Sequence, residues 1–155
     1  MSRKLVALAA LLLVGVTGTA GAAGGHVATK QRVTITATGS IDAFVLYTPT
    51  AGALKRDSGK ASSCCWSNHF VTRDGQRIEI NDPLVMLAGK HGTLEIRLRI
   101  EWVDAGNGYV VGTSTWKVVR GTGDYVDLTG GGRGAHAWLP SGPRTWRVEG
   151  FVGTS

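Results

Sequence analysis

The sequence predicts an all-β protein built as one antiparallel β-barrel of eight or nine strands. Apolar and polar residues alternate with a period of two over most of the chain, and no segment keeps the spacing of an amphipathic helix. Glycine accounts for 23 of the 155 residues, beside only 4 prolines and a hydrophobic share of 43%. This composition excludes collagen-like and disordered chains. Long strands with short links favour a closed barrel over a sandwich, because closure leaves no exposed sheet edge.

The clearest predicted strand runs from Thr93 to Asp104. Its even-numbered positions from Leu94 to Trp102 are large and apolar, whereas the odd-numbered positions from Glu95 to Glu101 are all charged. Successive side chains of a strand point to opposite faces, so one face should be buried and the other solvated. The same alternation predicts further strands at residues 32–38, 43–47, 69–72, 77–80, 84–88, 108–119, 134–139 and 145–152.

Turn-forming residues separate these strands. The strongest turn is at Asn107-Gly108, because a tight hairpin with positive φ is best formed by Asn and Gly. Asp74-Gly75 and the run from Asn81 to Pro83 are further turns. The segment from Ala51 to Ser63 is rich in Gly, Ser, Lys and Ala, and we predict a polar loop there.

The N-terminal residues have the features of a secretory signal peptide. Arg3 and Lys4 precede an apolar run over 5–16, which is shorter than the roughly 20 residues that cross a bilayer. The small residues of 20–22 suit a cleavage site. We therefore expect a secreted protein that is not inserted in a membrane, with a signal peptide at 1–22, a flexible stretch at 23–30 and one barrel domain at 31–155.

The expected mature chain is mildly basic. Removal of Arg3 and Lys4 leaves 15 of the 17 Lys and Arg against 11 Asp and Glu. The cations are spread from Lys30 to Arg147 without a long block, so we expect no nucleic-acid partner. Weak attraction to anionic cell-surface polymers stays open.

One connecting segment has a distinctive sequence. Trp116 lies in a strand that runs into Gly-Thr-Gly-Asp-Tyr at 121–125, followed by Leu128 and the glycines of 130–132. This pattern resembles a corner in the small secreted barrels related to allene oxide cyclase and to plant dirigent proteins, over roughly residues 92–152. The resemblance implies an eight-stranded barrel with a central cavity, used in those proteins to cyclise or steer small hydrophobic molecules. It supplies no catalytic residue, because no residue here lies in a matching catalytic motif.

The same corner makes physical sense as a turn. We expect glycines to permit a sharp exit from the strand, two apolar side chains to pack under the barrel end, and further glycines to let the next strand bend. The residues of this turn motif are Gly121, Gly123, Tyr125, Leu128, Gly130 and Gly132.

Cys64 and Cys65 are neighbours in the chain. Adjacent Cα atoms lie about 3.8 Å apart, below the roughly 4.4 Å of ordinary disulfides. Three interpretations stay open: a strained vicinal disulfide, intermolecular disulfides in a homo-oligomer, or a thiol pair that binds a soft metal with His69. Because this spacing offers at most three ligands, we predict no metal site and favour a structural or dimer-forming pair.

The five tryptophans are the candidate ligand-binding residues. Trp102, Trp116 and Trp146 continue apolar strand faces, which indicates core packing. Trp66 and Trp138 lie beside polar residues near predicted loops, where they could stack on a sugar or an aromatic ligand. The ligand-binding set that we predict is Trp66, Trp102, Trp116 and Trp138.

Other motifs give no support to hydrolase, metalloprotease or cofactor chemistry. The segment 132–137 has the Gly-x-Gly-x-x-Ala spacing of a dinucleotide fingerprint but lies among β-patterned residues without a following helix. No P-loop, His-Glu-x-x-His or Gly-x-Ser-x-Gly motif occurs. We expect no cofactor.

The leading functional hypothesis is a secreted, non-enzymatic barrel that binds a small apolar or aromatic ligand, or a surface partner, at its mouth. One alternative is a cyclase- or isomerase-like enzyme that steers a reactive intermediate, which requires a buried, unpaired carboxylate or arginine inside the barrel. Another alternative is an extracellular structural or interaction protein.

Overall fold

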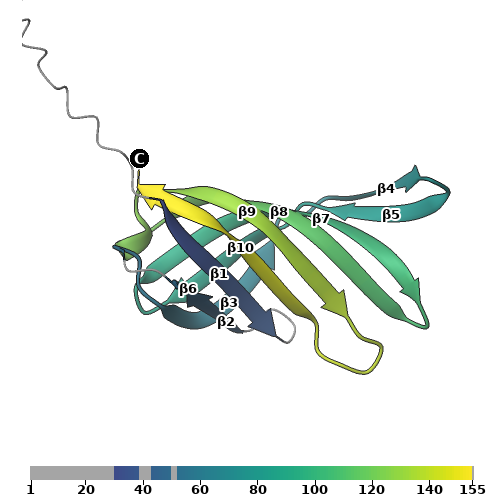
Figure 1. Ribbon diagram of the computed structural model, residues 1–155, viewed down its shortest axis with the longest axis horizontal. Helices are drawn as coiled ribbons and strands as arrows, with labels where there is room; N and C mark the ends of the chain where they lie inside the picture. The colour runs from purple at the N-terminus through teal and green to yellow at the C-terminus, as the bar shows by residue number, and fades with distance from the viewer. Residues whose placement is uncertain (1–29, 39–42, 50–51, 155) are drawn as a thin grey trace, which may run out of the picture.

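The computed structural model describes residues 30–38, 43–49 and 52–154, and these residues form an all-β fold (Figure 1). The predicted signal peptide, its cleavage site and nearly all of the 23–30 stretch lie outside the described residues. The elements are β1 (Gln31–Thr38), β2 (Ala43–Tyr47), β3 (Asp57–Cys64), β4 (Asn68–Arg73), β5 (Gln76–Asn81), β6 (Leu84–Gly89), β7 (Gly92–Gly106), β8 (Tyr109–Gly121), the short 3-10 helix η1 (Gly123–Tyr125), β9 (Leu128–Trp138) and β10 (Thr145–Thr154).

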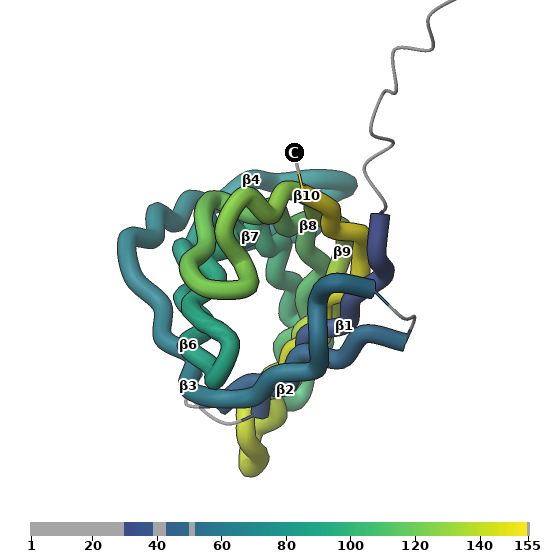
Figure 2. Tube along the Cα trace, turned by 90° about the vertical axis from the view of Figure 1, so that its left-hand side faces the viewer, coloured from purple at the N-terminus to yellow at the C-terminus, as the bar shows by residue number. Residues whose placement is uncertain are grey.

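Eight of these strands close into an antiparallel barrel, as predicted. The order around the barrel is β7-β6-β3-β2-β1-β10-β9-β8, and β8 pairs back onto β7. Figure 2 looks roughly along the barrel and shows the strands as a ring. Each of these eight strands therefore pairs with another strand on both sides.

The remaining two strands form a hairpin outside the ring. One edge of β7 pairs first with β6, over 92–97, and then with β5, over 100–103. The β4–β5 hairpin therefore extends the wall of the barrel at the end opposite to the C-terminus (Figure 1). We call this hairpin end the open end.

The predicted loop at 51–63 is wrong, because its second half is strand β3. This strand pairs with β2 and with β6. Its buried residues are Asp57 and Ala61, and Gly59 lies between them. None of these has a large apolar side chain, so the alternation of buried and exposed residues was hidden in small and polar types.

The barrel interior is apolar and its outer face is charged. Leu94, Ile96, Leu98 and Ile100 of β7 are buried, and the charged side chains lie on the opposite face, as predicted. Glu95 on that face is nevertheless only 7% exposed, in an ion pair with Arg120. Most of the other core residues alternate in the same way along their strands: Val33, Ile35, Ala37, Phe44, Leu46, Val85, Leu87, Trp116, Trp146, Val148 and Val152.

The corner between β8 and β9 closes the other end of the barrel. Tyr125 and Leu128 are 1% and 8% exposed, which confirms that they pack under the barrel end. Gly123 has a φ of +61°, and a Cβ there would overlap the carbonyl oxygen of His91. In Figure 2 this light-green corner lies across the end of the ring that faces the viewer.

A buried carboxylate holds this closed end together. The Tyr125 hydroxyl donates a hydrogen bond of 2.6 Å to Asp57 of β3. Asp57 also accepts hydrogen bonds from the backbone N–H groups of Ser58, Lys90 and His91, at 2.7, 3.0 and 3.1 Å. One side chain thus ties β3, the β6–β7 turn and η1 to one another.

Glycines of β9 make room for a tryptophan to cross the sheet. Trp116 of β8 pairs in register with Gly132 of β9, which pairs with Gly150 of β10. The Trp116 indole N–H donates to the carbonyl oxygen of Glu149, at 3.0 Å, so the ring reaches across β9 to β10. The approach is close because neither glycine carries a side chain.

We expect Gly132→Ala to lower the free energy of unfolding by about 1–3 kcal/mol, because its Cβ would overlap the carbonyl oxygen of Glu149 and the strands would have to shift. Gly142→Ala is the matched control, since a Cβ there meets the Leu139 side chain at 3.2 Å in an exposed turn. Equilibrium urea unfolding measures both variants. Equal stability of the two would contradict the proposed role of Gly132.

Candidate functional site: an aromatic pocket at the open end

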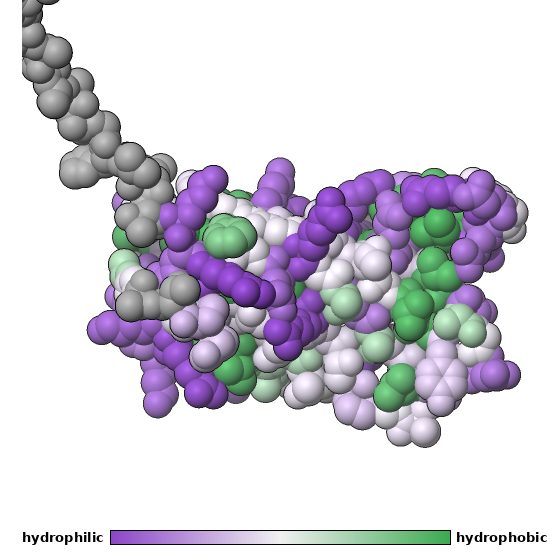
Figure 3. Space-filling view, in the orientation of Figure 1, coloured by the Kyte–Doolittle hydropathy of each residue, from purple (hydrophilic) through white to green (hydrophobic). Residues whose placement is uncertain are grey.

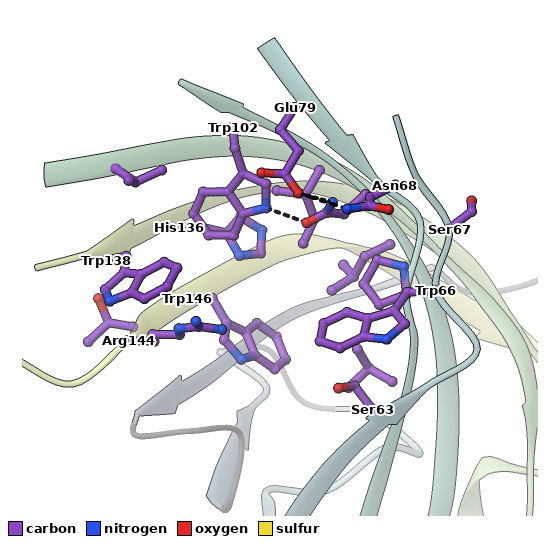
Figure 4. A pocket seen from close by; sticks show the side chains of 17 residues that line it. Ser63, Trp66, Ser67, Asn68, Glu79, Trp102, His136, Trp138, Arg144 and Trp146 are labelled. Atoms are coloured by element: carbon purple, nitrogen blue, oxygen red, sulfur yellow. Dashed lines mark hydrogen bonds between the residues drawn. The ribbon is translucent and has the colours of Figure 1, made fainter. Parts of the chain in front are cut away.

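A cavity of about 500 Å³ lies at the open end of the barrel, bordered by the β4–β5 hairpin (Figure 4). Its walls come from strands that are far apart in the sequence, including β3, β7, β9 and β10. Because β7 continues past β6, one edge of its far half pairs with the hairpin in place of β6, while its other edge pairs with β8, and the cavity lies beside this half.

Four tryptophans surround the cavity. Trp102 and Trp146 project inward from β7 and β10, whereas Trp66 precedes the hairpin and Trp138 ends β9. Figure 4 shows their rings around one space. Trp66 and Trp138 are 62% and 44% exposed, while Trp146 is 8% exposed, so the aromatic lining runs from the core to the surface. Large flat side chains of this kind offer stacking surfaces to apolar or aromatic molecules.

A buried histidine lies between two of these rings. His136 contacts Trp102 edge-on and stacks against Trp146, with ring centroids 5.4 and 6.3 Å apart. Its Nε2 atom lies 2.8 Å from the Ser114 hydroxyl. Burial lowers the pKa of His136 to about 4, so the ring is neutral near pH 7 and adds a polar group without a charge.

Hydrogen-bonding side chains of the hairpin form one edge of the pocket. Asn81 accepts the indole N–H of Trp102, at 3.0 Å, and donates to Glu79 at 3.0 Å. Asn68 donates to the same Glu79 oxygen at 3.4 Å. This network fixes the orientation of Trp102 and leaves polar atoms at the pocket edge (Figure 4).

A cation lies at another side of the mouth. The Arg144 guanidinium lies 3.7 Å from the centre of the Trp138 ring. This contact holds the exposed ring by a cation–π interaction. The pocket therefore combines an uncharged aromatic floor with Glu79 and Arg144 at its rim.

The structure brings three of the four predicted ligand-binding residues together. Trp66, Trp102 and Trp138 line the pocket, whereas Trp116 packs in the core and is not among its lining residues. Trp146, which the sequence indicated as core, lines the pocket as well. Sequence patterns give no signal for the other polar lining residues described above, namely Asn68, Glu79, Asn81, His136 and Arg144.

Hydrogen bonding of the buried polar side chains limits which of them can contact a ligand. Among the described residues, every fully buried side-chain nitrogen or oxygen has a hydrogen-bond partner. The tryptophans of the pocket can hold a flat apolar ring, and the polar side chains at its edge can hydrogen-bond substituents of that ring.

Cys64 and Cys65 lie next to the pocket. Both are exposed and neither forms a disulfide in this structure, while Ser63 and Trp66 on either side line the cavity. The hydrogen bond with the Cys65 thiol, followed by burial, raises the pKa of Cys64. Intermolecular pairing of these thiols stays a prediction.

Within the part of the chain that the structure describes, no three His, Cys, Asp or Glu side chains are grouped as a metal site would require. None of the described residues belongs to a helix long and apolar enough to cross a membrane. Comparison of the chain with protein-family models, with curated proteins and with solved structures finds no match.

Proposed function

We propose that this protein binds a small, flat, apolar or aromatic molecule in the pocket at the open end of its barrel. The observation that carries the proposal is the set of four tryptophans around a cavity of about 500 Å³. That volume lies within the roughly 300–1,000 Å³ of small-molecule sites, which are mostly apolar with a few placed polar groups.

The distribution of charge supports an uncharged ring as the bound part of the ligand. The floor consists of apolar side chains and the neutral His136. Glu79 and Arg144 lie at the rim, where they would meet polar substituents that remain near solvent. A charged group placed on the floor would lose its hydration without gaining a partner of opposite charge.

The proposal extends to the family and the location of the protein. The closed eight-stranded barrel and the glycine-rich corner at 121–132 support a relation to the allene oxide cyclase and dirigent-like barrels. The N-terminal residues support export from the cell. Binding takes precedence over cyclase-like catalysis, because the buried carboxylate Asp57 is hydrogen-bonded at the end away from the pocket, and the carboxylate of the pocket, Glu79, accepts hydrogen bonds from Asn68 and Asn81.

Isothermal titration of the protein with neutral planar aromatics, such as naphthol, tests this function. We expect saturable binding at one site, and Trp138→Ala should weaken it about tenfold, because it removes a stacking wall worth about 1–2 kcal/mol. Phe151→Ala is the matched control: Phe151 is 56% exposed, lies on the outer side of β10 and does not line the pocket.

Two results would contradict the proposal. The first is absence of saturable binding for every aromatic in the series. The second is an equal loss of affinity in Trp138→Ala and Phe151→Ala, which would show that the compounds bind exposed aromatic side chains in general.

A further inference from the structure

We infer that the outer face of β7, β8 and β9 is a second binding surface, and that it takes an extended anionic polysaccharide. Four cations on these strands define what we call the basic face: Arg97 and Arg99 of β7, Lys117 of β8 and Arg133 of β9. All four project outward, away from the buried residues that alternate with them.

The strand register gathers these four cations. Lys117 lies directly opposite Arg97, and Thr115 lies opposite both Arg99 and Arg133 on its two sides. Neighbouring strands are roughly 4.8 Å apart, so Arg99 and Arg133 are about 10 Å apart across the sheet. Like charges directly opposite each other destabilise a sheet. The placement of Arg97 opposite Lys117 therefore lowers the stability of the fold, and an anion bound between the two side chains would relieve their repulsion.

The carboxylates closest in the register are bound to other cations. Glu101 and Glu95 of β7 form ion pairs with Arg73 and Arg120, at 3.1 and 2.8 Å. Neither carboxylate is thus left to neutralise Lys117, which lies on the neighbouring strand.

The carboxylate on the other side of the basic face is also paired with cations outside this face. Glu149, which is opposite Arg133 in the register, is bound by Arg32 and Arg147. Hydrogen bonds from Arg32 and then Arg147 lower the pKa of Glu149, so this carboxylate stays ionised and paired with those two arginines.

Among the described residues, only Arg99 of the basic face makes an ion pair, with Asp82 at 3.5 Å. Arg97 instead donates to the backbone carbonyl oxygens of Cys65 and Asp82. Lys117 and Arg133 have no carboxylate within ion-pair distance in the described part of the chain. Two full positive charges thus remain for a ligand.

The surface between the cations consists of small residues and hydroxyl groups. Thr113 and Thr115 are exposed on β8, next to Gly131 and Ala135 of β9. Phe151 lies opposite Gly131 in the register and is exposed at the edge of this surface. Figure 3 is drawn from the side of β1, β10 and β9, and shows hydrophilic side chains beside paler residues on this neighbouring part of the barrel wall.

These features favour a polysaccharide over a nucleic acid. Sulfate or carboxylate groups would meet the cations, sugar hydroxyls the threonines, and the apolar face of a sugar ring the side chain of Phe151. Binders of single-stranded nucleic acid instead line their grooves with several aromatic side chains, one for each stacked base. Among the described residues beside the four cations, the exposed aromatic side chain is Phe151 of β10, while Tyr109 lies at the far end of β8, eight residues from Lys117. It is also independent of the pocket, whose lining side chains lie at the open end.

Binding of the full chain to heparin, a sulfated polysaccharide, at several salt concentrations tests this inference. We expect saturable binding that weakens with salt. The double variant Lys117→Gln/Arg133→Gln should bind at least about tenfold more weakly at low salt, and the slope of log K against log salt should fall by about 2. Both positions are exposed, so thermal unfolding should be unchanged or slightly improved.

The matched control is Lys60→Gln/Lys90→Gln, which removes the same charge from exposed positions on β3 and in the β6–β7 turn. We expect its affinity for heparin to remain within about twofold of the natural chain. Trp138→Ala should also leave heparin binding unchanged, which separates this surface from the pocket.

Three results would overturn the inference. Equal loss in the two double variants would show a response to net charge alone. Absence of heparin binding at low salt would remove the surface altogether. A single-stranded oligonucleotide that binds as tightly as heparin at equal salt would assign the face to nucleic acid.

Discussion

Replacement of Asp57 by Ala is expected to lower the free energy of unfolding by about 3–5 kcal/mol. The change leaves the Tyr125 hydroxyl and the backbone N–H groups of Ser58, Lys90 and His91 without their acceptor at the closed end of the barrel. A buried donor that loses its partner costs roughly 1–3 kcal/mol, and water that enters the vacated space recovers part of the total. Equilibrium urea unfolding measures the loss.

Tyr125→Phe separates the hydroxyl from the rest of the network. It removes one donor and keeps the buried ring, so we expect a loss of about 1–2 kcal/mol. The double variant should lose less than the sum of the single losses, because the two groups share one hydrogen bond. Additive losses, or a loss below 1 kcal/mol for Asp57→Ala, would show that the network does not hold the corner.

The same carboxylate makes the closed end sensitive to strong acid. Burial acts to raise the pKa of Asp57, but the hydrogen bond from Tyr125 and those from the backbone outweigh it, so the pKa falls below its ordinary value of 3.8. Its contribution to stability is therefore present above pH 3.8 and is lost as the pH falls through the lower value in the folded state. Burial, and then Asp57, raise the pKa of Tyr125 above its ordinary value of 10, so the contribution of this side chain to stability is complete below pH 10 and is lost as the pH rises further.

The second large effect is a loss of stability between pH 6.5 and 4, which we expect from His136. Burial lowers its pKa in the folded state to about 4, whereas the unfolded chain takes up the proton near 6.5. The unfolded state therefore binds more protons in this window. The contribution of His136 is complete above pH 6.5 and is lost as the pH falls toward 4, by about 3 kcal/mol in total.

His136→Gln tests this expectation, because glutamine can still hydrogen-bond Ser114 and does not titrate. Urea unfolding at intervals from pH 7 to pH 4 should give a flatter curve for the variant than for the natural chain. Parallel curves would place the titrating group elsewhere. Since the Asp57 window lies below 3.8, the open and closed ends of the barrel should respond to acid separately.

The sequence predicted the fold well where inward positions are large. The alternation from Leu94 to Trp102 identified β7, and the pattern of 121–132 identified the corner whose Tyr125 packs under the barrel end. Strand β3 was missed because its buried positions are Asp57 and Ala61. In a sequence, an aspartate usually indicates a loop. The hydrogen-bond partner that allows Asp57 to be buried, Tyr125, lies 68 residues away and cannot be recognised from the local pattern.

The site was predicted only in part for a different reason. Alternation tells which side chains point inward, but not how far along the barrel axis each one lies. Trp102, Trp116 and Trp146 therefore have equivalent patterns, although Trp116 packs in the core across Gly132 and the other two line the pocket. The contribution of Glu79 and Asn81 depends on the pairing of β5 with the far half of β7, which no local pattern specifies.

The shared edge of β7 makes the pocket wall an exchangeable part of the molecule. Barrel closure needs β7 to pair with β6 over 92–97 and with β8, and the hairpin supplies none of those pairings. Residues 66–81 can therefore diverge in length and sequence, and so alter what the pocket admits, without changing the register of the eight strands. On the proposed function, changes in this hairpin alter ligand selectivity while the eight-stranded scaffold stays the same, and grafted hairpins offer a route to new selectivity.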